Sequence, residues 1–264
     1  MEVAQGDAAC LPGEVLWTLP EDGGGGTTVR LGSGTTMDGG AVKSTKAGLL
    51  RRRDNPKRFW VERRHQRYVP SLEDLVVGIV MEAHGENFAV DIGGPCLAQL
   101  PILDFTGATR RNRPMLRYGD VVYARVTLAD RDIDPTISCV DASVGRSKGL
   151  GPLKGGLTLK CATGCARDLL AGAEGSGQED SVLSLLGGHL HYECCLGVNG
   201  LVWVKGETHA ETILVRNAIQ NYETIERSAH SDGSASDAAD AQITRKVRAM
   251  VAQLLKQHAS DRDD

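Results

Sequence analysis

The middle of the chain contains short apolar runs separated by glycines and polar residues. In one run Phe88, Val90 and Ile92 alternate with smaller or polar residues, which places the three on one face of a strand. Glycine permits bends and tight turns between such strands. Five strands are predicted within residues 70–146, namely LVVGIVMEA, ENFAVDIGG, CLAQLPI, DVVYARVTLA and TISCVDAS. Five short, curled strands indicate a small OB barrel.

A different succession of elements follows in residues 147–226. LTLKC is predicted as a strand, CARDLL and VLSLL as short helices, HLHYECCLG and LVWVKG as a strand pair, and ETHAETILVRNAIQNYETI as an amphipathic helix. This β-α-α-β-β-α order is that of a KH-type domain.

The two ends of the chain have weaker patterns. Residues 1–69 predict a small β domain, with strands at 47–50 and 59–61 separated by the basic linker RRRDNPKR, and with an exposed Gly-rich loop at 23–40. Residues 227–264 predict a polar linker at 228–240 and then a helix. That helix carries Ile243, Val247, Met250 or Val251, and Leu254 on one face, so it docks on this chain or on a partner. The expected fold class is mostly β with α+β.

Composition limits the possible functions. The formal net charge is −4 and the pI about 6.0, so the protein as a whole does not attract nucleic acid and any RNA contact must be a local patch. There is no apolar run long enough to span a membrane and no secretory signal pattern at the N-terminus, which predicts a soluble intracellular protein. Seven irregularly spaced cysteines are typical of reduced thiols.

Basic residues are concentrated between Lys43 and Arg67. Such a run neutralises phosphates without reading sequence, although a solvated loop, a nuclear-import signal or an acidic protein partner is the alternative. RNA binding is the favoured interpretation for Arg63, Arg64 and Arg67, whereas the alternatives stay equal for residues 51–53.

A second basic cluster contains Arg110, Arg111 and Arg113 in a loop that ends at Pro114. OB barrels bind oligonucleotides through one face and its loops, combining basic residues with stacking aromatics. These arginines are therefore predicted to bind RNA. The candidate stacking residues are Phe88, Phe105 and Tyr123, although Phe88 also fits a core position.

Two glycine motifs lie in the KH-type segment. In Gly197-Val198-Asn199-Gly200 the Asn-Gly pair predicts a type I′ hairpin turn, which is a structural role. The GxxG match at residues 172–175 contains Glu174 and no basic residue, so this domain is predicted to pack or to bind protein instead of clamping RNA.

Catalytic and metal-binding candidates are weaker. Asp130, Asp132, Asp134 and Asp141 could bind magnesium in a ribonuclease, but Arg131 and Pro135 interrupt them and a solvated turn is favoured. A zinc site is conceivable from Cys161, Cys165 and Cys194 or Cys195 with His189 or His191, but core packing is favoured. No nucleophile or phosphate-loop motif occurs, so neither catalysis nor a metal or other cofactor is expected.

Three longer stretches support a family resemblance. RYVPSLEDLVVGIVMEAHGENFAVDIGG, LDFTGATRRNRPMLRYGDVVYARV and LGVNGLVWVKG resemble the S1/KH cap subunits of the RNA exosome, in the family of exosome complex component 3, or ribosomal RNA-processing protein 40. The resemblance spans most of residues 12–223 and implies an S1-type barrel. It also implies that Gly197, Asn199, Gly200 and Trp203 support the interface between the KH-type domain and the barrel.

The resemblance has functional implications too. It implies a non-catalytic subunit seated on six RNase PH-like ring proteins beside other S1-domain caps, guiding single-stranded RNA to an associated 3′-to-5′ nuclease in nucleus, nucleolus and cytoplasm. The alternatives are a free-standing S1/KH regulator of translation or ribosome assembly and, less favoured, a metal-dependent ribonuclease.

Overall fold

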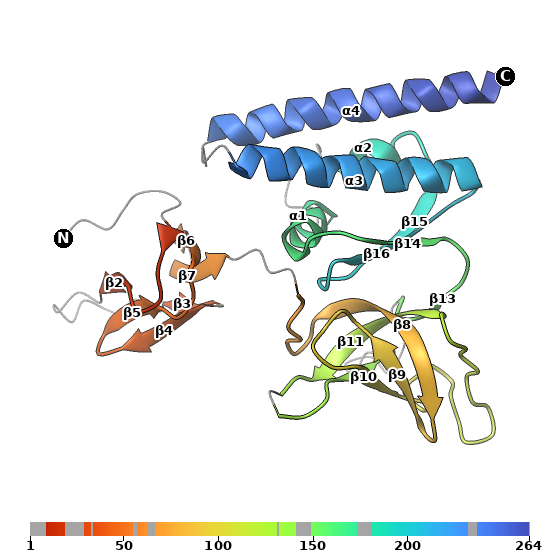
Figure 1. Ribbon diagram of the computed structural model, residues 1–264, viewed down its shortest axis with the longest axis horizontal. Coiled ribbons are helices and arrows are strands. Elements are labelled where there is room, and N and C mark those ends of the chain that lie inside the picture. The colour runs from red at the N-terminus through yellow and green to blue at the C-terminus, as the bar shows by residue number, and fades with distance from the viewer. Residues whose placement is uncertain are drawn as a thin grey trace. The chain divides into compact units, whose positions relative to one another are not determined.

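The computed structural model divides into two compact units, Met1–Arg64 and His65–Asp264, shown in Figure 1. The structure describes residues 9–18, 29–32, 34–54, 57–62, 67–130, 132–140, 149–173, 181–231 and 237–263.

The N-terminal unit consists of two small β-sheets. The first has the order β1 (Ala9–Cys10), β6 (Gly48–Asp54), β7 (Lys57–Glu62) and β3 (Arg30–Leu31), and the second has the order β2 (Val15–Thr18), β5 (Ala41–Ser44) and β4 (Thr35–Asp38). Leu16, Val42, Leu50 and Phe59 pack between the sheets with other buried side chains. The ring of Trp17 stacks on that of Phe59, with 5.7 Å between centroids.

Two sequence predictions for this unit were wrong. The basic stretch 51–58 is not a linker, because β6 and β7 pair antiparallel along it, with Arg52 opposite Phe59 and Asp54 opposite Lys57. The predicted loop at 23–40 contains β3 and β4, although residues 23–28 lie outside the described residues. The strands predicted at 47–50 and 59–61 overlap β6 and β7. The charged residues between them, and the residues of β3 and β4, do not alternate between apolar and polar positions, so the sequence lacks the period-2 signal of a strand there.

The second unit begins with a closed five-stranded barrel. Its strands are β8 (Leu75–His84), β9 (Asn87–Asp91), β10 (Ala98–Pro101), β11 (Val121–Leu128) and β12 (Thr136–Ser138). Pairing follows β10-β9-β8-β11, and β12 closes the barrel by pairing parallel with β10 and antiparallel with β11. The five predicted strands are confirmed. A further strand, β13 (Gly151–Leu153), extends the sheet beside β11 and was not predicted.

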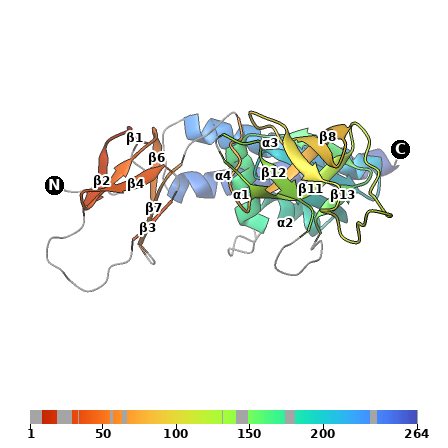
Figure 2. The ribbon, with the colours of Figure 1, turned by 90° about the horizontal axis from the view of Figure 1, so that it is seen from below.

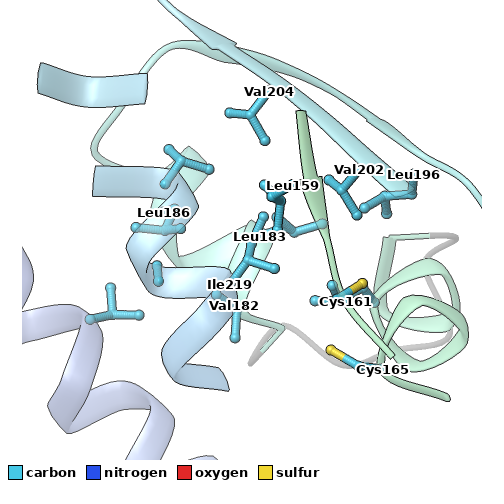
Figure 3. Packing of buried hydrophobic residues seen from close by; sticks show 14 of the residues in the cluster. Leu159, Cys161, Cys165, Val182, Leu183, Leu186, Leu196, Val202, Val204 and Ile219 are labelled. Carbon is cyan, nitrogen blue, oxygen red and sulfur yellow. The ribbon is translucent and has the colours of Figure 1, made fainter. Parts of the chain in front are cut away.

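The predicted KH-type succession is also observed. It comprises β14 (Leu157–Lys160), α1 (Thr163–Ala173), α2 (Val182–Gly187), β15 (Tyr192–Leu196), β16 (Leu201–Gly206) and α3 (His209–Ser231). The sheet has the order β14-β16-β15 and lies between the helices and the barrel in Figure 1. Leu159, Val202 and Val204 of the sheet face Leu186 and Ile219 of the helices in one apolar core, as Figure 3 shows.

The final helix, α4 (Asp237–Asp263), packs on α3 and α2 of this same chain. Figures 1 and 2 both show it running alongside α3. Val247 and Val251 are buried in the KH core, which settles the question of where the helix docks. The linker predicted at 228–240 was wrong in part, because residues 228–231 belong to α3 and residues 237–240 to α4. Among the described helices, none combines the length and hydropathy needed to cross a membrane.

Candidate nucleic-acid interface

The loop between β10 and β11 is held in shape by its own polar groups. The backbone N–H of Asn112 donates to Thr109 Oγ1 at 3.0 Å, and the N–H of Thr109 donates to the Asn112 carbonyl at 3.0 Å. Arg113 Nε donates to the Arg110 carbonyl at 3.3 Å. Because Phe105 is buried at the start of the loop, the arginines that follow it are carried on an anchored turn.

The guanidinium groups of this loop face solvent. Arg110, Arg111, Arg113 and Arg117 are all exposed, and none forms an ion pair with any residue that the structure describes. The nearby carboxylate of Asp120 is bound to backbone instead, because its Oδ2 accepts from the Arg117 N–H at 2.7 Å. The loop is therefore a local positive patch on a protein whose net charge is −4.

None of the aromatic residues predicted to stack on bases is exposed, because Phe88 and Phe105 are buried and Tyr123 is half-buried. Phe88 is 3% exposed and meets the 7% exposed Phe105 edge to face within the barrel core, with 6.3 Å between the ring centroids. The Tyr123 hydroxyl donates to the Leu196 carbonyl at 3.4 Å. The prediction for Phe88 was wrong because alternation along a barrel strand places a large aromatic inside.

The exposed aromatic residue of this region is Tyr118, with 77% of its surface accessible. It lies next to Arg117 and follows Met115, which is 93% exposed. Neither residue was predicted from the sequence to contact RNA. Their position in a loop between Pro114 and Gly119, outside any alternating strand, was the signal for exposure. A base can stack on an exposed tyrosine ring beside arginines.

A surface hollow of about 420 Å³ lies between this loop and the chain formed by β13 and the residues that follow it. It is lined by Pro114, Met115 and Leu116 on the loop side and by Pro152, Leu153 and Lys154 on the other. The lining is largely apolar and also carries the cation of Lys154 and the carboxylate of Asp120, so it suits a planar, partly apolar group.

Of the other predicted RNA-binding arginines, only Arg67 lies within the described residues. Arg67 is exposed ahead of β8. Arg63 and Arg64 lie outside the described residues. The three loop arginines are thus seen together on one exposed loop, whereas RNA binding by Arg63, Arg64 and Arg67 stays a prediction from the sequence.

The hairpin between β15 and β16 fastens the KH-type domain to the barrel. Asn199 is 4% exposed, and its Nδ2 donates to the carbonyls of Val77 at 2.7 Å and Ile92 at 2.9 Å. Its Oδ1 accepts from the Val77 N–H at 3.3 Å. The Val198 N–H also donates to the Leu75 carbonyl at 2.9 Å. One side chain thereby satisfies three backbone groups, two in β8 and one at the residue that follows β9.

At both glycines of this turn, a larger residue would clash with neighbouring backbone atoms. A Cβ on Gly197 would lie 2.7 Å from the Val77 nitrogen, and a Cβ on Gly200 would lie 2.4 Å from the Cys161 carbonyl oxygen. Gly200 has φ of +83°, whereas Asn199 does not have a positive φ. The predicted type I′ turn was therefore wrong, because that turn needs positive φ at both central residues. Asn199 serves through its amide and not through its backbone freedom.

Trp203 acts at the connection between the two domains. It is 3% exposed, and its Nε1 donates to the Gly155 carbonyl at 2.8 Å, in the segment that joins β13 to β14. A Cβ at the neighbouring Gly156 would lie 2.9 Å from this Nε1 atom. Trp203 therefore fixes the link from the barrel to the KH-type sheet.

The alternative chemical sites do not assemble in the described part of the chain. Asp130, Asp132 and Asp134 are exposed, and the Asp132 N–H donates to Asp130 Oδ1 at 3.0 Å, as in a solvated turn. Asp141 lies outside the described residues, as do Glu174 and Gly175 of the GxxG match, whose Gly172 and Ala173 belong to α1.

Cys161 and Cys165 are buried in the core of the KH-type domain, and the half-buried Cys194 packs against it. A hydrogen bond with Cys161 and burial raise the pKa of Cys165, and burial raises the pKa of Cys194 to about 11. Zinc binds thiolates, so these neutral thiols are poor ligands. Across the described residues, no three His, Cys, Asp or Glu side chains gather as a metal site would require.

Comparison with known proteins agrees with this architecture. Residues 68–151 match the family model of the exosome complex component RRP40 S1 domain, and residues 156–210 match a KH domain model. The chain is 38% identical over 220 residues to a relative from Dictyostelium discoideum named as an exosome complex component rrp40, covering 83% of this chain and 88% of that one. It is 34% identical over 235 residues to exosome complex component RRP40 of Homo sapiens, covering 80% and 82%.

A solved structure described as an exosome complex RNA-binding protein shares the fold. It has a TM-score of 0.51 and 18% identity, covering 70% of this chain and 97% of that one. The identity and coverage of the curated relatives, together with the match to the S1 domain model, show the family. This chain belongs to the exosome complex component RRP40 family.

Proposed function

We propose that this chain is a non-catalytic RNA-binding cap subunit of the RNA exosome that guides single-stranded RNA toward 3′-to-5′ processing and degradation. The observation that carries the proposal is the anchored loop with Arg110, Arg111 and Arg113 exposed on the barrel. Membership of the RRP40 family supports the assignment to the exosome.

The loop acts by charge and shape instead of by sequence recognition. Guanidinium groups bind phosphate oxygens in a forked geometry and keep their charge at every physiological pH. Phosphate contacts of this kind hold the RNA backbone without selecting bases. Tyr118 and the neighbouring hollow supply a stacking surface that tolerates any base.

The KH-type domain serves this function as a support. Asn199 and Trp203 fix it to the barrel through backbone hydrogen bonds, so the barrel loop is held on a rigid scaffold. Rigid support lowers the entropy that RNA binding must overcome. The proposed partners are the RNase PH-like ring subunits, the other S1-domain caps and a separate 3′-to-5′ nuclease, in the nucleus, nucleolus and cytoplasm.

Removal of the loop arginines tests the RNA-binding role. The triple variant Arg110→Ala, Arg111→Ala and Arg113→Ala should bind fluorescein-labelled oligouridylate about tenfold or more weakly, because several charge-assisted hydrogen bonds to phosphate disappear. Fluorescence anisotropy measures the affinity at several salt concentrations. The log-log slope of affinity against salt should weaken by about 0.7 for each phosphate that the variant no longer neutralises.

Arg227→Ala is the matched control, since Arg227 is 73% exposed on α3 and pairs there with Glu223. It should leave RNA affinity unchanged. Affinity purification of the tagged protein after RNase treatment tests the complex, and recovery of RNase PH-like ring proteins is expected. Equal RNA binding by the triple variant and the wild type, or recovery of ribosomal proteins alone, would overturn the proposal.

A further inference from the structure

The first sheet of the N-terminal unit presents a basic and aromatic surface that the proposed function does not use. Its members are Arg30 on β3, Arg58 and Trp60 on β7, and Arg51 on β6, which together are called the arginine–tryptophan face. Arg30 and Arg58 are exposed, while Arg51 and Trp60 are half-buried.

Strand register brings these residues together. Arg30 pairs with Arg58 across the parallel β3–β7 pair, and Arg51 pairs with Trp60 across the antiparallel β6–β7 pair. Residues directly opposite each other share a face of a sheet, and so do residues two apart on one strand. Since neighbouring strands lie about 4.8 Å apart, the four side chains start from adjacent points of one surface.

The Arg58 guanidinium lies over the Trp60 ring, with its carbon atom 5.7 Å from the ring centroid. Gly32 makes room for the indole, because a Cβ there would lie 2.6 Å from Trp60 Cβ. A cation above an aromatic face leaves the edge of the guanidinium free to bind an oxyanion. The arrangement combines a phosphate-binding group with a stacking group.

The position of Arg30 opposite Arg58 does not stabilise the sheet. Like charges directly opposite one another on a sheet destabilise it, and Arg30 and Arg58 stand in that relation. Neither forms an ion pair with any described residue. Of the acidic residues nearby, Asp38 belongs to the other sheet and is bound to Lys43 at 2.6 Å. The repulsion is relieved when an anion binds between the two arginines.

The charge of the region is also unlike that of the remaining chain. Residues 29–64 contain ten Lys or Arg and three Asp or Glu, whereas the whole protein has 30 and 34. A polyanion approaching the protein is therefore attracted to this segment.

We propose that the arginine–tryptophan face binds the backbone of single-stranded RNA as a second contact, distinct from the barrel loop. RNA is favoured over an acidic protein segment because carboxylates would bind only the guanidinium groups. RNA would bind them through its phosphates and would also stack a base on the indole ring. The inference rests on the proposed function, in that the two surfaces contact the same class of ligand.

The double variant Arg30→Gln and Arg58→Gln tests the face in the full chain. Its affinity for fluorescein-labelled oligouridylate should fall about tenfold, and the log-log salt slope should weaken by about 1.4, which corresponds to two phosphates. Its melting temperature should change little, because the repulsion that the substitutions remove offsets the cation–π contact that Arg58 loses with Trp60. Lys43→Gln is the matched control in the same unit and should leave RNA affinity unchanged.

Tryptophan fluorescence identifies the class of ligand. Oligouridylate should quench the emission of the wild type, and Trp60→Phe should abolish most of that quenching while Trp17 and Trp203 remain. Polyglutamate of equal charge is the competing probe. Unchanged RNA affinity in the double variant overturns the proposal. Quenching of Trp60 by polyglutamate without any quenching by oligouridylate also overturns it, because that result would assign the face to an acidic protein.

The barrel-loop triple variant separates this inference from the proposed function. If the two surfaces act independently, the reductions in binding free energy from the loop and face variants should add in the combined variant. Weaker RNA binding in the face variant, with no change in the loop variant, would refute the loop's proposed role and leave the face standing. The reverse result would refute the face alone.

Discussion

At the scale of single residues, the side chains with the largest structural effect are polar and buried. Asn199 fills the space between the hairpin and the barrel with an amide whose donors and acceptor are all used. A buried amide of this kind contributes stability only while every partner is present. The exposed arginines of the β10–β11 loop are the opposite case, since their removal leaves no buried group without a partner.

Asn199→Ala should lower the free energy of unfolding by about 2–4 kcal/mol, because the Val77 and Ile92 carbonyls lose their donor in a buried site. Urea denaturation measures this reduction. RNA affinity of the folded fraction should remain that of the wild type. Weakened RNA binding with unchanged stability would show that Asn199 acts at the ligand site and not as a clasp.

At the scale of elements, α4 completes the KH core by covering α3 and α2. Val247 and Val251 point into that core, with exposed fractions of 2% and 4%. Ile243, Met250 and Leu254 pack around them, which is the face that the sequence pattern predicted. The helix is thus part of the fold of this unit, and its opposite face carries Arg245, Lys246 and Lys256.

Val251→Ala should cost about 2 kcal/mol, because it removes buried methyl groups and leaves a cavity between α4 and its neighbours. The matched control is Gln253→Ala on the exposed side of the same helix, which should change stability by less than about 0.5 kcal/mol. Both values come from urea denaturation. Equal stability of the two variants would mean that α4 leaves this site in solution.

At the scale of the whole molecule, buried thiols and phenols give stability a definite pH dependence. Burial, with the charge of Asp104 as a second cause, raises the pKa of Cys139 to about 12. Burial also raises the pKa values of Tyr68 and Tyr192, and a hydrogen bond with Cys161 together with burial raises that of Cys165. An unfolded thiol has a pKa of about 8.5. The native state therefore holds protons that the unfolded chain releases at high pH.

The free energy of unfolding should fall as pH rises from about 8.5 toward 12, since the unfolded state binds fewer protons over that range. Cys139→Ala should reduce the slope by up to about 1.4 kcal/mol per pH unit, the contribution of one proton. Urea denaturation at several pH values measures the slope. Cys96→Ala is the control, because Cys96 is exposed, and its slope should match the wild type.

The sequence by itself determined the order of the domains, the five barrel strands and the KH-type succession. Alternating positions such as Phe88, Val90 and Ile92 report burial directly, because strand side chains alternate between core and solvent. The arginine loop was also visible, since three arginines before a proline have no place in a core.

Only the tertiary structure decided which residues meet across long separations in the sequence. The bonds of Asn199 to Val77 and Ile92 span 122 and 107 positions, and no local pattern encodes them. The pairing of Arg30 with Arg58 likewise depends on the register of β3 and β7. These strands are short and charged, so their pairing could not be predicted from the sequence. Local periodicity specifies which face of an element is buried, whereas the partner of that face depends on how the elements pack.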